Sequence, residues 1–416
     1  MHTRTRHTRV AAVALSSVAA LALAACGAGG SGGSSDGNVV LGVINTFGDP
    51  AQGASASDQY DGMQLAVKYV AEHGGLFNGK KLELRQGNEN GQTALVSTST
   101  RKMVNDGVKL IIGPALTADC LAAAPIVDQA GGVAQVGCTT TSVTGPKRTG
   151  KNLYRWDTND AITSTALATA VAKKFPDTQS VDVVAYDYLQ GHQGVDTIEK
   201  TLRDKGINFT QGKVFFVPSG TTNYSSQVGA LAQQPKDGKK RVLVLLTWGS
   251  GYLNFIQQAL PLNILANYQA VITTSMYYTS AKALNGKAPA VYNSYGTCHA
   301  SLWKNPVMDW FTQQMQATHH RLPDDWSTSG FNQVLIYAAA INKAKSTDPK
   351  KVLEAEATLS VETANGTMTM NPDTHQAQRS TPVCQTQGDS TAPEGVKMVT
   401  GEILPPEATN AAGAGA

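Results

Sequence analysis

The sequence has little charge and few aromatic residues for its length. Of its 416 residues, 16% are charged and 6% are aromatic, whereas 41% are hydrophobic. So small a charged fraction excludes a disordered polyelectrolyte, and the hydrophobic fraction is large enough for a folded core. A chain of this length is expected to form about two to three domains.

A surplus of basic residues is missing from most of the chain. The 34 lysines and arginines exceed the 31 acidic residues by three, and Arg4, Arg6 and Arg9 lie in the first 25 residues, where no acid occurs. The remainder is therefore electrically neutral. Because binding to nucleic acid needs an excess of lysine and arginine to neutralise phosphates, a nucleic-acid partner is not expected.

The N-terminal segment predicts export and lipid anchoring. Basic residues 1–9 precede the apolar run 10–25, which is too short to span a bilayer and has the order of a secretory signal. Because the run ends in Leu-Ala-Ala-Cys, which resembles a bacterial lipobox, we expect residues 1–25 to be removed and Cys26 to be lipidated. Residues 26–38 would form the anchor and a Gly/Ser tether. An ordinary signal peptide before a chance cysteine is the alternative.

Cysteine is scarce, and the motifs of common cofactor sites are absent. Beside Cys26 the chain has Cys120, Cys138, Cys298 and Cys384, an even number that suggests two disulfides with three alternative pairings. There is no CxxC or HExxH motif, so we expect no metal and no cofactor. A GxSxG match at 29–33 lies in the tether, and a near match to a phosphate-binding loop at 74–80 lacks the final Ser or Thr. We therefore do not expect an enzyme.

Apolar runs alternate with amphipathic segments along the body of the chain. Apolar runs without polar alternation predict strands buried on both faces of a parallel sheet, and the segments between them predict helices. The alternation predicts an α/β fold with two doubly wound parallel-sheet lobes. Residues 405–416 are expected to be a disordered tail. The expected strands are 39–44, 109–113, 133–137, 181–186, 214–217, 242–246 and 270–274, and the expected helices are 58–73, 93–105, 118–129, 161–174, 194–205, 224–233, 251–259, 307–315 and 328–344.

The order of several short motifs resembles the substrate-binding proteins of branched-chain amino acid ABC transporters. These motifs are Gly74-Gly75, the run 102–114, the strand end Gly137-Cys138-Thr139-Thr140, and the segments 223–228 and 366–372. The resemblance covers roughly residues 39–404. It implies a type I periplasmic binding fold, in which three segments cross between two lobes and the ligand lies between them. We expect crossings near 158, 296 and 368, with lobe 1 formed by 39–158 and 297–367 and lobe 2 by 159–296 and 368–404.

The resemblance implies a ligand-binding site whose part in lobe 1 has the residue types of the family. Thr117 matches the residue that holds the ligand carboxylate, and it precedes a helix whose free N–H groups favour an anion. Gly137, Thr139 and Thr140 match the loop that makes the next ligand contacts. Aromatic positions of the family fall on Ser55, Gly191 and Trp248. Tyr188 could also stack on a ligand, whereas we expect Tyr252 and Tyr277 in the core.

The second-lobe half departs from the family pattern. The acid that pairs with the ligand ammonium falls near Thr274 and Ser275, where no carboxylate exists. Because a buried ammonium without a counter-charge is costly, we expect a small carboxylate or polar solute with an apolar or aromatic body and no obligatory α-amine. Asp187 and Asp119 are the candidates for a replacement acid.

The expected fold also favours one disulfide pattern. Cys120 opens a helix and Cys138 closes the following strand, so adjacent loops could join them, and Cys298 and Cys384 lie near the second and third crossings. We therefore expect Cys120–Cys138 and Cys298–Cys384.

The function that the sequence predicts is that of a monomeric lipoprotein outside the cytoplasmic membrane. It would bind a small solute and deliver it to the permease of an ABC importer. A receptor of the same fold that feeds a signalling partner is the alternative, and a secreted hydrolase would need a catalytic triad that cannot be assembled here.

Overall fold

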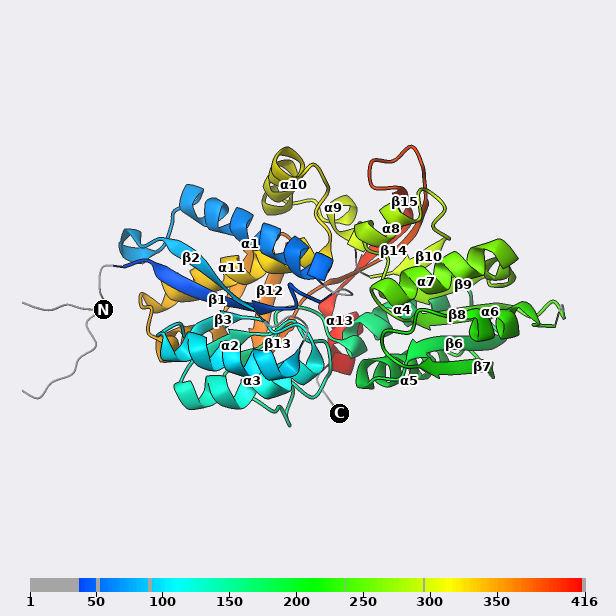
Figure 1. Ribbon diagram of the computed structural model, residues 1–416, viewed down its shortest axis with the longest axis horizontal. Helices are drawn as coiled ribbons and strands as arrows, with labels where there is room; N and C mark the ends of the chain where they lie inside the picture. The colour runs from blue at the N-terminus through cyan, green and yellow to red at the C-terminus, as the bar shows by residue number, and fades with distance from the viewer. Residues whose placement is uncertain (1–36, 50–52, 89–91, 236, 295, 414–416) are drawn as a thin grey trace, which may run out of the picture. The chain divides into compact units, whose positions relative to one another are not determined.

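The computed structural model describes residues 37–49, 53–88, 92–235, 237–294 and 296–413 (Figure 1). The expected signal peptide and the lipidation site at Cys26 lie outside the described residues. In the described part of the chain, no helix combines the length and the hydrophobicity needed to span a bilayer.

The first lobe is built on a five-stranded parallel sheet of order β2-β1-β3-β4-β5. Alternate side chains of β1 belong to two cores on opposite faces, which explains why this strand is apolar without polar alternation. Helices α1 and α11 pack on one face and α2 and α3 on the other. The strands are β1 (Val39–Asn45), β2 (Leu82–Asn88), β3 (Leu110–Ile112), β4 (Val133–Gln135) and β5 (Leu153–Tyr154), and the helices are α1 (Gly53–Glu72), α2 (Thr93–Asn105), α3 (Thr117–Ala130) and α11 (Asp325–Ala344).

The second lobe contains a seven-stranded sheet of order β15-β14-β10-β9-β8-β6-β7. Its last five strands in this order pair in parallel, whereas β14 and β15 add an antiparallel edge. Helices α4 and α5 belong to the core on one face, and α6, α7 and α8 to the core on the other. The strands are β6 (Ser180–Tyr186), β7 (Thr210–Val217), β8 (Arg241–Leu246), β9 (Ala270–Thr273), β10 (Val291–Asn293), β14 (Thr381–Gly388) and β15 (Val396–Leu404), and the helices are α4 (Asp160–Lys174), α5 (Leu189–Asp204), α6 (Ser225–Ala232), α7 (Ser250–Ala259) and α8 (Tyr278–Ala283).

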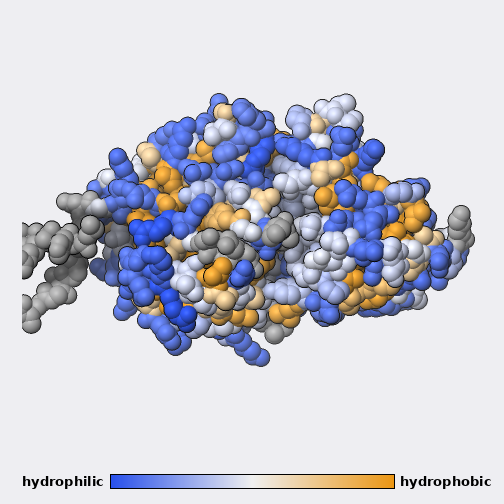
Figure 2. Space-filling view, in the orientation of Figure 1, coloured by the Kyte–Doolittle hydropathy of each residue, from blue (hydrophilic) through white to orange (hydrophobic). Residues whose placement is uncertain are grey.

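Two parallel-sheet lobes confirm the predicted fold class, and each expected strand and helix corresponds to an element of the structure. The remaining helices are α9 (His299–Leu302), α10 (Pro306–His319) and α12 (Pro349–Ala357), with short 3₁₀ turns η1 (Phe77–Gly79), η2 (Leu260–Leu262), η3 (Ile264–Asn267) and η4 (Gly296–Cys298). On the face seen in Figure 2, orange hydrophobic patches are separated by blue hydrophilic residues.

A small antiparallel sheet places the third crossing later than expected. Strands β11 (Ser360–Thr363), β12 (Gly366–Asn371) and β13 (Gln376–Gln378) pair with one another, and Met368, Met370 and Ala377 are buried in the core of lobe 1. The chain enters the second sheet only at Thr381, in β14. The expected crossing near 368 is therefore wrong, because a hairpin keeps residues 368–378 in lobe 1, and the crossing lies at Arg379 and Ser380.

The C-terminal segment also differs from the expectation of disorder. Residues Pro406–Gly413 form helix α13, which packs against α4. Thr409 of α13 is 1% exposed. The alanine-rich composition that suggested a tail is compatible with a helix once one face of it packs against the body.

Candidate functional site

A cavity lies between the two lobes, and the space in it is about 970 Å³ when the open solvent at its mouth is included. Its walls come from the loops that follow the carboxyl ends of the sheet strands, from the start of α11 and from the crossing segments, as expected for paired α/β lobes. The lining residues of lobe 1 are Ala115, Leu116, Thr117, Gly137, Thr139, Asp325, Trp326 and Ser329, those of lobe 2 are Tyr188, Gln190, Trp248, Thr274, Tyr277, Ser294 and Pro382, and those of the crossings are Asp157, Thr158 and Arg379.

The structure brings most of the predicted site residues to this cavity. Thr117, Gly137, Thr139, Trp248 and Thr274 line it, and Gly191 lines a smaller pocket beside it.

Ser55 and Thr140 do not line either space. Ser55 lies in the first turn of α1, and Thr140 is fully buried. The Thr140 hydroxyl is 3.2 Å from the Ser142 hydroxyl and 3.3 Å from Oε1 of Gln193. Neither residue therefore lines the cavity, although the resemblance matched both to positions that contact the ligand.

The part of the cavity in lobe 1 contains the start of α3, where helix N–H groups can bind an anion. Thr117 is the first residue of this helix, and the side chain of the residue before it makes no capping hydrogen bond. The first N–H groups of a helix have no intrahelical acceptor, so they can bind an anionic group. Asp119 in the same turn accepts a 2.6 Å hydrogen bond from Thr93 and does not line the cavity. Its carboxylate therefore does not compete for the place of an anionic ligand.

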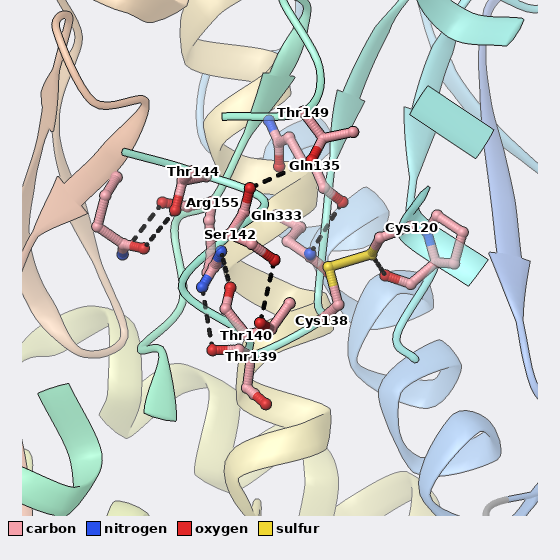
Figure 3. The surroundings of a disulfide bond; sticks show 12 residues. Cys120, Gln135, Cys138, Thr139, Thr140, Ser142, Thr144, Thr149, Arg155 and Gln333 are labelled. Carbon is pink, nitrogen blue, oxygen red and sulfur yellow. Dashed lines mark hydrogen bonds between the residues drawn. A yellow bond between two sulfur atoms is a disulfide. The ribbon is translucent and has the colours of Figure 1, made fainter. Parts of the chain in front are cut away.

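The disulfide Cys120–Cys138 joins the two segments that carry the first-lobe site residues (Figure 3). The S–S distance is 2.14 Å and the Cα atoms are 6.5 Å apart. Cys120 follows Thr117 by less than one helical turn, and Cys138 lies between Gly137 and Thr139. This confirms the predicted pairing and shows that the bridge holds the α3 start beside the loop after β4.

The second predicted disulfide, Cys298–Cys384, is also present. Its S–S distance is 1.99 Å and its Cα atoms are 5.7 Å apart. The Ser294 hydroxyl donates a 2.6 Å hydrogen bond to the carbonyl of Pro382 in the same region. The bridge and this hydrogen bond join the segment after β10 to β14, close to the second and third crossings.

Two cavity residues missed by the sequence analysis, Asp157 and Arg379, form an ion pair between the first and third crossings. Nη1 of Arg379 lies 2.7 Å from Oδ1 of Asp157, and the arginine side chain is 2% exposed. Ser329 of α11 donates a hydrogen bond to the other carboxylate oxygen. The charge of Asp157 is therefore paired with that of Arg379, and its two carboxylate oxygens are held by different partners.

Asp325 is a further acidic residue of the cavity, at the start of α11. One of its oxygens accepts a 2.6 Å hydrogen bond from the N–H of Gly296. Burial raises the pKa of the Asp325 carboxyl well above its usual range, and the negative charge of Asp324 adds to this effect. Asp187, by contrast, pairs at 2.8 Å with His192 and, like Asp119, does not line the cavity.

Aromatic side chains form much of the second-lobe wall. The ring of Trp248 packs edge-on against Tyr186, with centroids 4.4 Å apart, and lies 5.7 Å from the ring of Tyr188. Tyr277, expected in the core, instead lines the cavity, and its ring lies 6.5 Å from that of Trp326. Tyr252 is buried, as expected. Such rings can cover an apolar or aromatic ligand.

Comparisons with known proteins agree with this architecture. The sequence pattern described as "Periplasmic binding protein" matches residues 38–391. The chain therefore belongs to the periplasmic binding protein family, and its fold is that of the substrate-binding proteins of branched-chain amino acid ABC transporters. No curated protein matches the chain.

Solved structures with the same fold have low sequence identity to the chain. An amino acid ABC transporter substrate-binding protein from Pseudomonas fluorescens is 18% identical, with a TM-score of 0.76 over 91% of this chain and 98% of its own. A solute-binding protein from Rhodopseudomonas palustris in complex with 4-hydroxybenzoate is 16% identical, with a TM-score of 0.75 over 89% and 98%. A leucine-binding protein from Thermotoga maritima is 18% identical, with a TM-score of 0.72 over 89% and 98%.

Proposed function

We propose that the protein is an extracytoplasmic lipoprotein that binds a small carboxylate-bearing solute between its lobes and delivers it to an ABC importer. The observation that carries this proposal is the cavity itself, because each lobe contributes about half of its wall. A ligand that contacts both halves stabilises the closed arrangement of the lobes, which is the form that a permease would recognise.

The ligand carboxylate would lie at the start of α3. There it would accept hydrogen bonds from the Thr117 hydroxyl and from helix N–H groups, and the helix dipole would favour its charge. Solved neighbours of this fold include proteins of amino acid transport and a complex with an aromatic acid. Both ligand classes have the carboxylate that this half of the cavity suits.

The two acids that line the cavity would not require an α-amine. Asp157 is already paired with Arg379. Burial raises the pKa of Asp325, which weakens its tendency to supply a full counter-charge to an ammonium group. Trp248 and Tyr188 would cover the body of the ligand. We therefore expect acids without an amine to bind, and we expect no catalytic reaction.

Calorimetry with matched acids tests the ligand class. The panel contains leucine, 4-methylpentanoate, benzoate and 4-hydroxybenzoate, and binding to the native fold would also raise the melting temperature. At least one amine-free acid should bind, and its affinity should fall about tenfold in Trp248→Ala while changing little in Asp325→Asn. Binding of leucine alone, lost in Asp325→Asn, would show that Asp325 is the counter-charge of an amine and would reject the amine-free ligand class.

The anchor is tested separately from the ligand. Cys26→Ser removes the thiol that would carry the lipid, so the protein should leave the membrane fraction or keep its signal peptide. Removal of the signal should otherwise leave a monomeric body whose ligand affinity equals that of the full chain. An unchanged membrane fraction of the Cys26→Ser variant would contradict lipid anchoring at this residue.

A further inference from the structure

The Cys120–Cys138 disulfide connects two segments of the chain that both contribute to the cavity wall. Cys120 lies in the first turn of α3, the turn that begins with Thr117. Cys138 lies between Gly137 and Thr139, which line the cavity. Both cysteines are 0% exposed. The bridge therefore joins the two segments from which the part of the cavity in lobe 1 takes its hydrogen-bonding groups.

One of these segments, the loop after β4, is held by a buried arginine (Figure 3). Arg155 is 0% exposed, and its guanidinium group donates hydrogen bonds of 3.2 Å and 2.7 Å to the carbonyl oxygens of Thr139 and Thr140. The N–H of Asp160 donates a further 2.9 Å hydrogen bond to the Thr139 carbonyl. Because hydrogen bonds from a charged donor are stronger than neutral ones, this loop has firm support besides the disulfide.

The other segment, the first turn of α3, has weaker support from its own helix. The residue before the helix makes no side-chain capping hydrogen bond, and Pro125 lies inside the helix. Since proline has no N–H group, the carbonyl of Leu121 lacks the helical hydrogen bond that would join the first turn to the next. The hydrogen-bond ladder is therefore weakened just after the turn that begins with Thr117.

The disulfide connects this turn to the loop at a point inside the helix. The N–H of Gly137 also donates a 2.9 Å hydrogen bond to the carbonyl of Pro114, but this residue precedes the helix. A 2.6 Å hydrogen bond from Thr93 to Asp119 ties the turn to α2 rather than to the loop. Loss of the disulfide would leave these two hydrogen bonds, and the first turn could then tilt away from Thr139.

We propose that the Cys120–Cys138 disulfide is a positioning element for the ligand carboxylate, because it keeps the α3 N-terminus and the Thr139 loop close enough for one carboxylate to contact both. This inference rests on the function proposed above. With the bridge, the anion-binding N–H groups are in place before the ligand arrives. Without it, the ligand has to order the turn, and part of the binding free energy is lost.

The Cys298–Cys384 disulfide is a matched control. Its cysteines are equally buried, at 0% and 1% exposed. It joins residues 86 positions apart, against 18 for the first bridge, so it constrains the unfolded chain more. Cys384 also pairs with Asn293 in the β10–β14 ladder, so strand pairing holds these segments together without the bridge. Loss of this second bridge should therefore lower stability but leave the site in place.

The first experiment compares the full-length double variants Cys120→Ala/Cys138→Ala and Cys298→Ala/Cys384→Ala. Alanine is chosen because it leaves no buried thiol or hydroxyl. Calorimetry uses leucine, 4-methylpentanoate, benzoate and 4-hydroxybenzoate. For each acid that binds the wild type, affinity should fall about tenfold in the first variant and less than about twofold in the second. The urea midpoint should fall at least as much in the second variant as in the first.

Thr117→Val shows whether the bridge acts through the start of α3. In the wild type this substitution removes one hydrogen bond and should lower affinity about fivefold. In Cys120→Ala/Cys138→Ala it should lower affinity much less, because the turn is already displaced. Pro125→Ala, at an exposed position, restores the missing N–H and should recover part of the affinity that loss of the bridge removes. Independent, additive effects of Thr117→Val and of bridge removal would overturn the inference.

Reduction of the wild-type protein tests the inference without any substitution. Dithiothreitol reduces a disulfide to two thiols and is itself oxidised to a cyclic disulfide. Because coupling between ligand and bridge is reciprocal, a saturating acid should raise about tenfold the ratio of reduced to oxidised dithiothreitol at which Cys120–Cys138 is half reduced. The ratio for Cys298–Cys384 should not change. Alkylation of the free thiols followed by peptide mass spectrometry measures both, and equal shifts of the two ratios would contradict a role specific to the site.

Hydrogen exchange separates failure of this inference from failure of the proposed function. If no acid of the panel binds the wild type, the proposed function fails, and exchange still decides whether the bridge holds the turn. The amides of residues 121–124 should exchange about tenfold faster in Cys120→Ala/Cys138→Ala than in Cys298→Ala/Cys384→Ala. Equal exchange rates, or equal losses of affinity in the two variants, would overturn the positioning role and leave solute binding intact.

Discussion

Arg379 and Asp157 show how a single ion pair can hold the crossings together. Nη1 of Arg379 lies 2.7 Å from Oδ1 of Asp157. The arginine side chain is 2% exposed and the aspartate side chain is 28% exposed. Gln376 adds a 2.7 Å hydrogen bond from its side-chain amide to the carbonyl of Asp157. Loss of Asp157 would leave the arginine charge in a place with little access to water, and loss of Arg379 would leave the partly exposed carboxylate without its cation. Either change should cost more than loss of an exposed pair.

We therefore predict that Arg379→Met lowers the free energy of unfolding by about 3 kcal/mol. The double variant Asp157→Asn/Arg379→Met should recover part of this loss, because no unpaired charge remains. Urea unfolding of the two single variants and the double variant gives the coupling energy. Asp204→Asn, which breaks the exposed Lys200–Asp204 pair, is the control and should have little effect. Additive losses in the double variant would contradict a direct pairing.

Site residues could be predicted only where they lie next to a recognisable strand end or helix start. Thr117, Gly137 and Thr139 are of this kind, and the structure places them in the cavity wall. Asp157 and Asp325 come from a crossing segment and from a helix start 168 positions later in the numbering. Nothing in the local pattern joins these two, because only the packing of α11 against the first crossing brings them to one cavity.

At the scale of elements, α1 and α11 depend on two glycines for their close contact. A Cβ atom at Gly62 would lie 1.8 Å from the carbonyl oxygen of Ser327, and one at Gly330 would lie 2.1 Å from that of Gln59. Both obstacles are backbone atoms of the opposite helix, so a rotamer change cannot relieve them. Since α11 carries Asp325, Trp326 and Ser329, this contact also fixes one wall of the cavity.

We predict that Gly62→Ala separates the two helices and lowers the free energy of unfolding by about 3 kcal/mol or more. Ligand affinity should fall as well, because the α11 wall would shift. Unfolding in urea and calorimetry measure the two effects. Gly229→Ala in α6 meets no neighbouring atom and should be neutral or slightly stabilising. If Gly62→Ala behaved like this control, the close helix contact would be wrong.

The order of elements was predictable because buried parallel strands are apolar throughout, and both disulfides followed from that order. The third crossing was not, because β12 and β13 form a hairpin whose buried residues, such as Met368, pack into lobe 1 rather than continue into lobe 2. Whether a hairpin stays or crosses depends on the core that its side chains enter. Helix α13 was missed for a similar reason, since its short alanine-rich sequence gains order by packing on α4.

At the scale of the whole molecule, the stability of the fold is linked to pH through several buried acids. Burial raises the pKa of Asp58 to about 8, that of Asp160 to about 7 and that of Glu356 to about 8. In the unfolded chain these groups have ordinary values near 3.8 for aspartate and 4.5 for glutamate. The folded protein therefore binds these protons more tightly than the unfolded chain does, and each proton stabilises the fold.

The sign of the pH dependence follows from this difference. The stabilisation is fully present below about pH 4, the unfolded values, and is lost as the pH rises through the folded values of about 7 to 8. The free energy of unfolding should thus decrease from pH 5 to pH 8.

Glu356 isolates one part of this effect, because it is fully buried and accepts a 2.6 Å hydrogen bond from the indole N–H of Trp156. Glu356→Gln keeps the acceptor and cannot ionise, so the variant should lose less stability than the wild type between pH 5 and pH 8. Its advantage at pH 8 should be a few kcal/mol at most, by about 1.4 kcal/mol per pKa unit. Urea midpoints at the two pH values measure it, with Glu354→Gln on the exposed side of α12 as the control. If the free energy of unfolding fell equally in Glu356→Gln and wild type, protonation of Glu356 would not contribute to the pH dependence of stability.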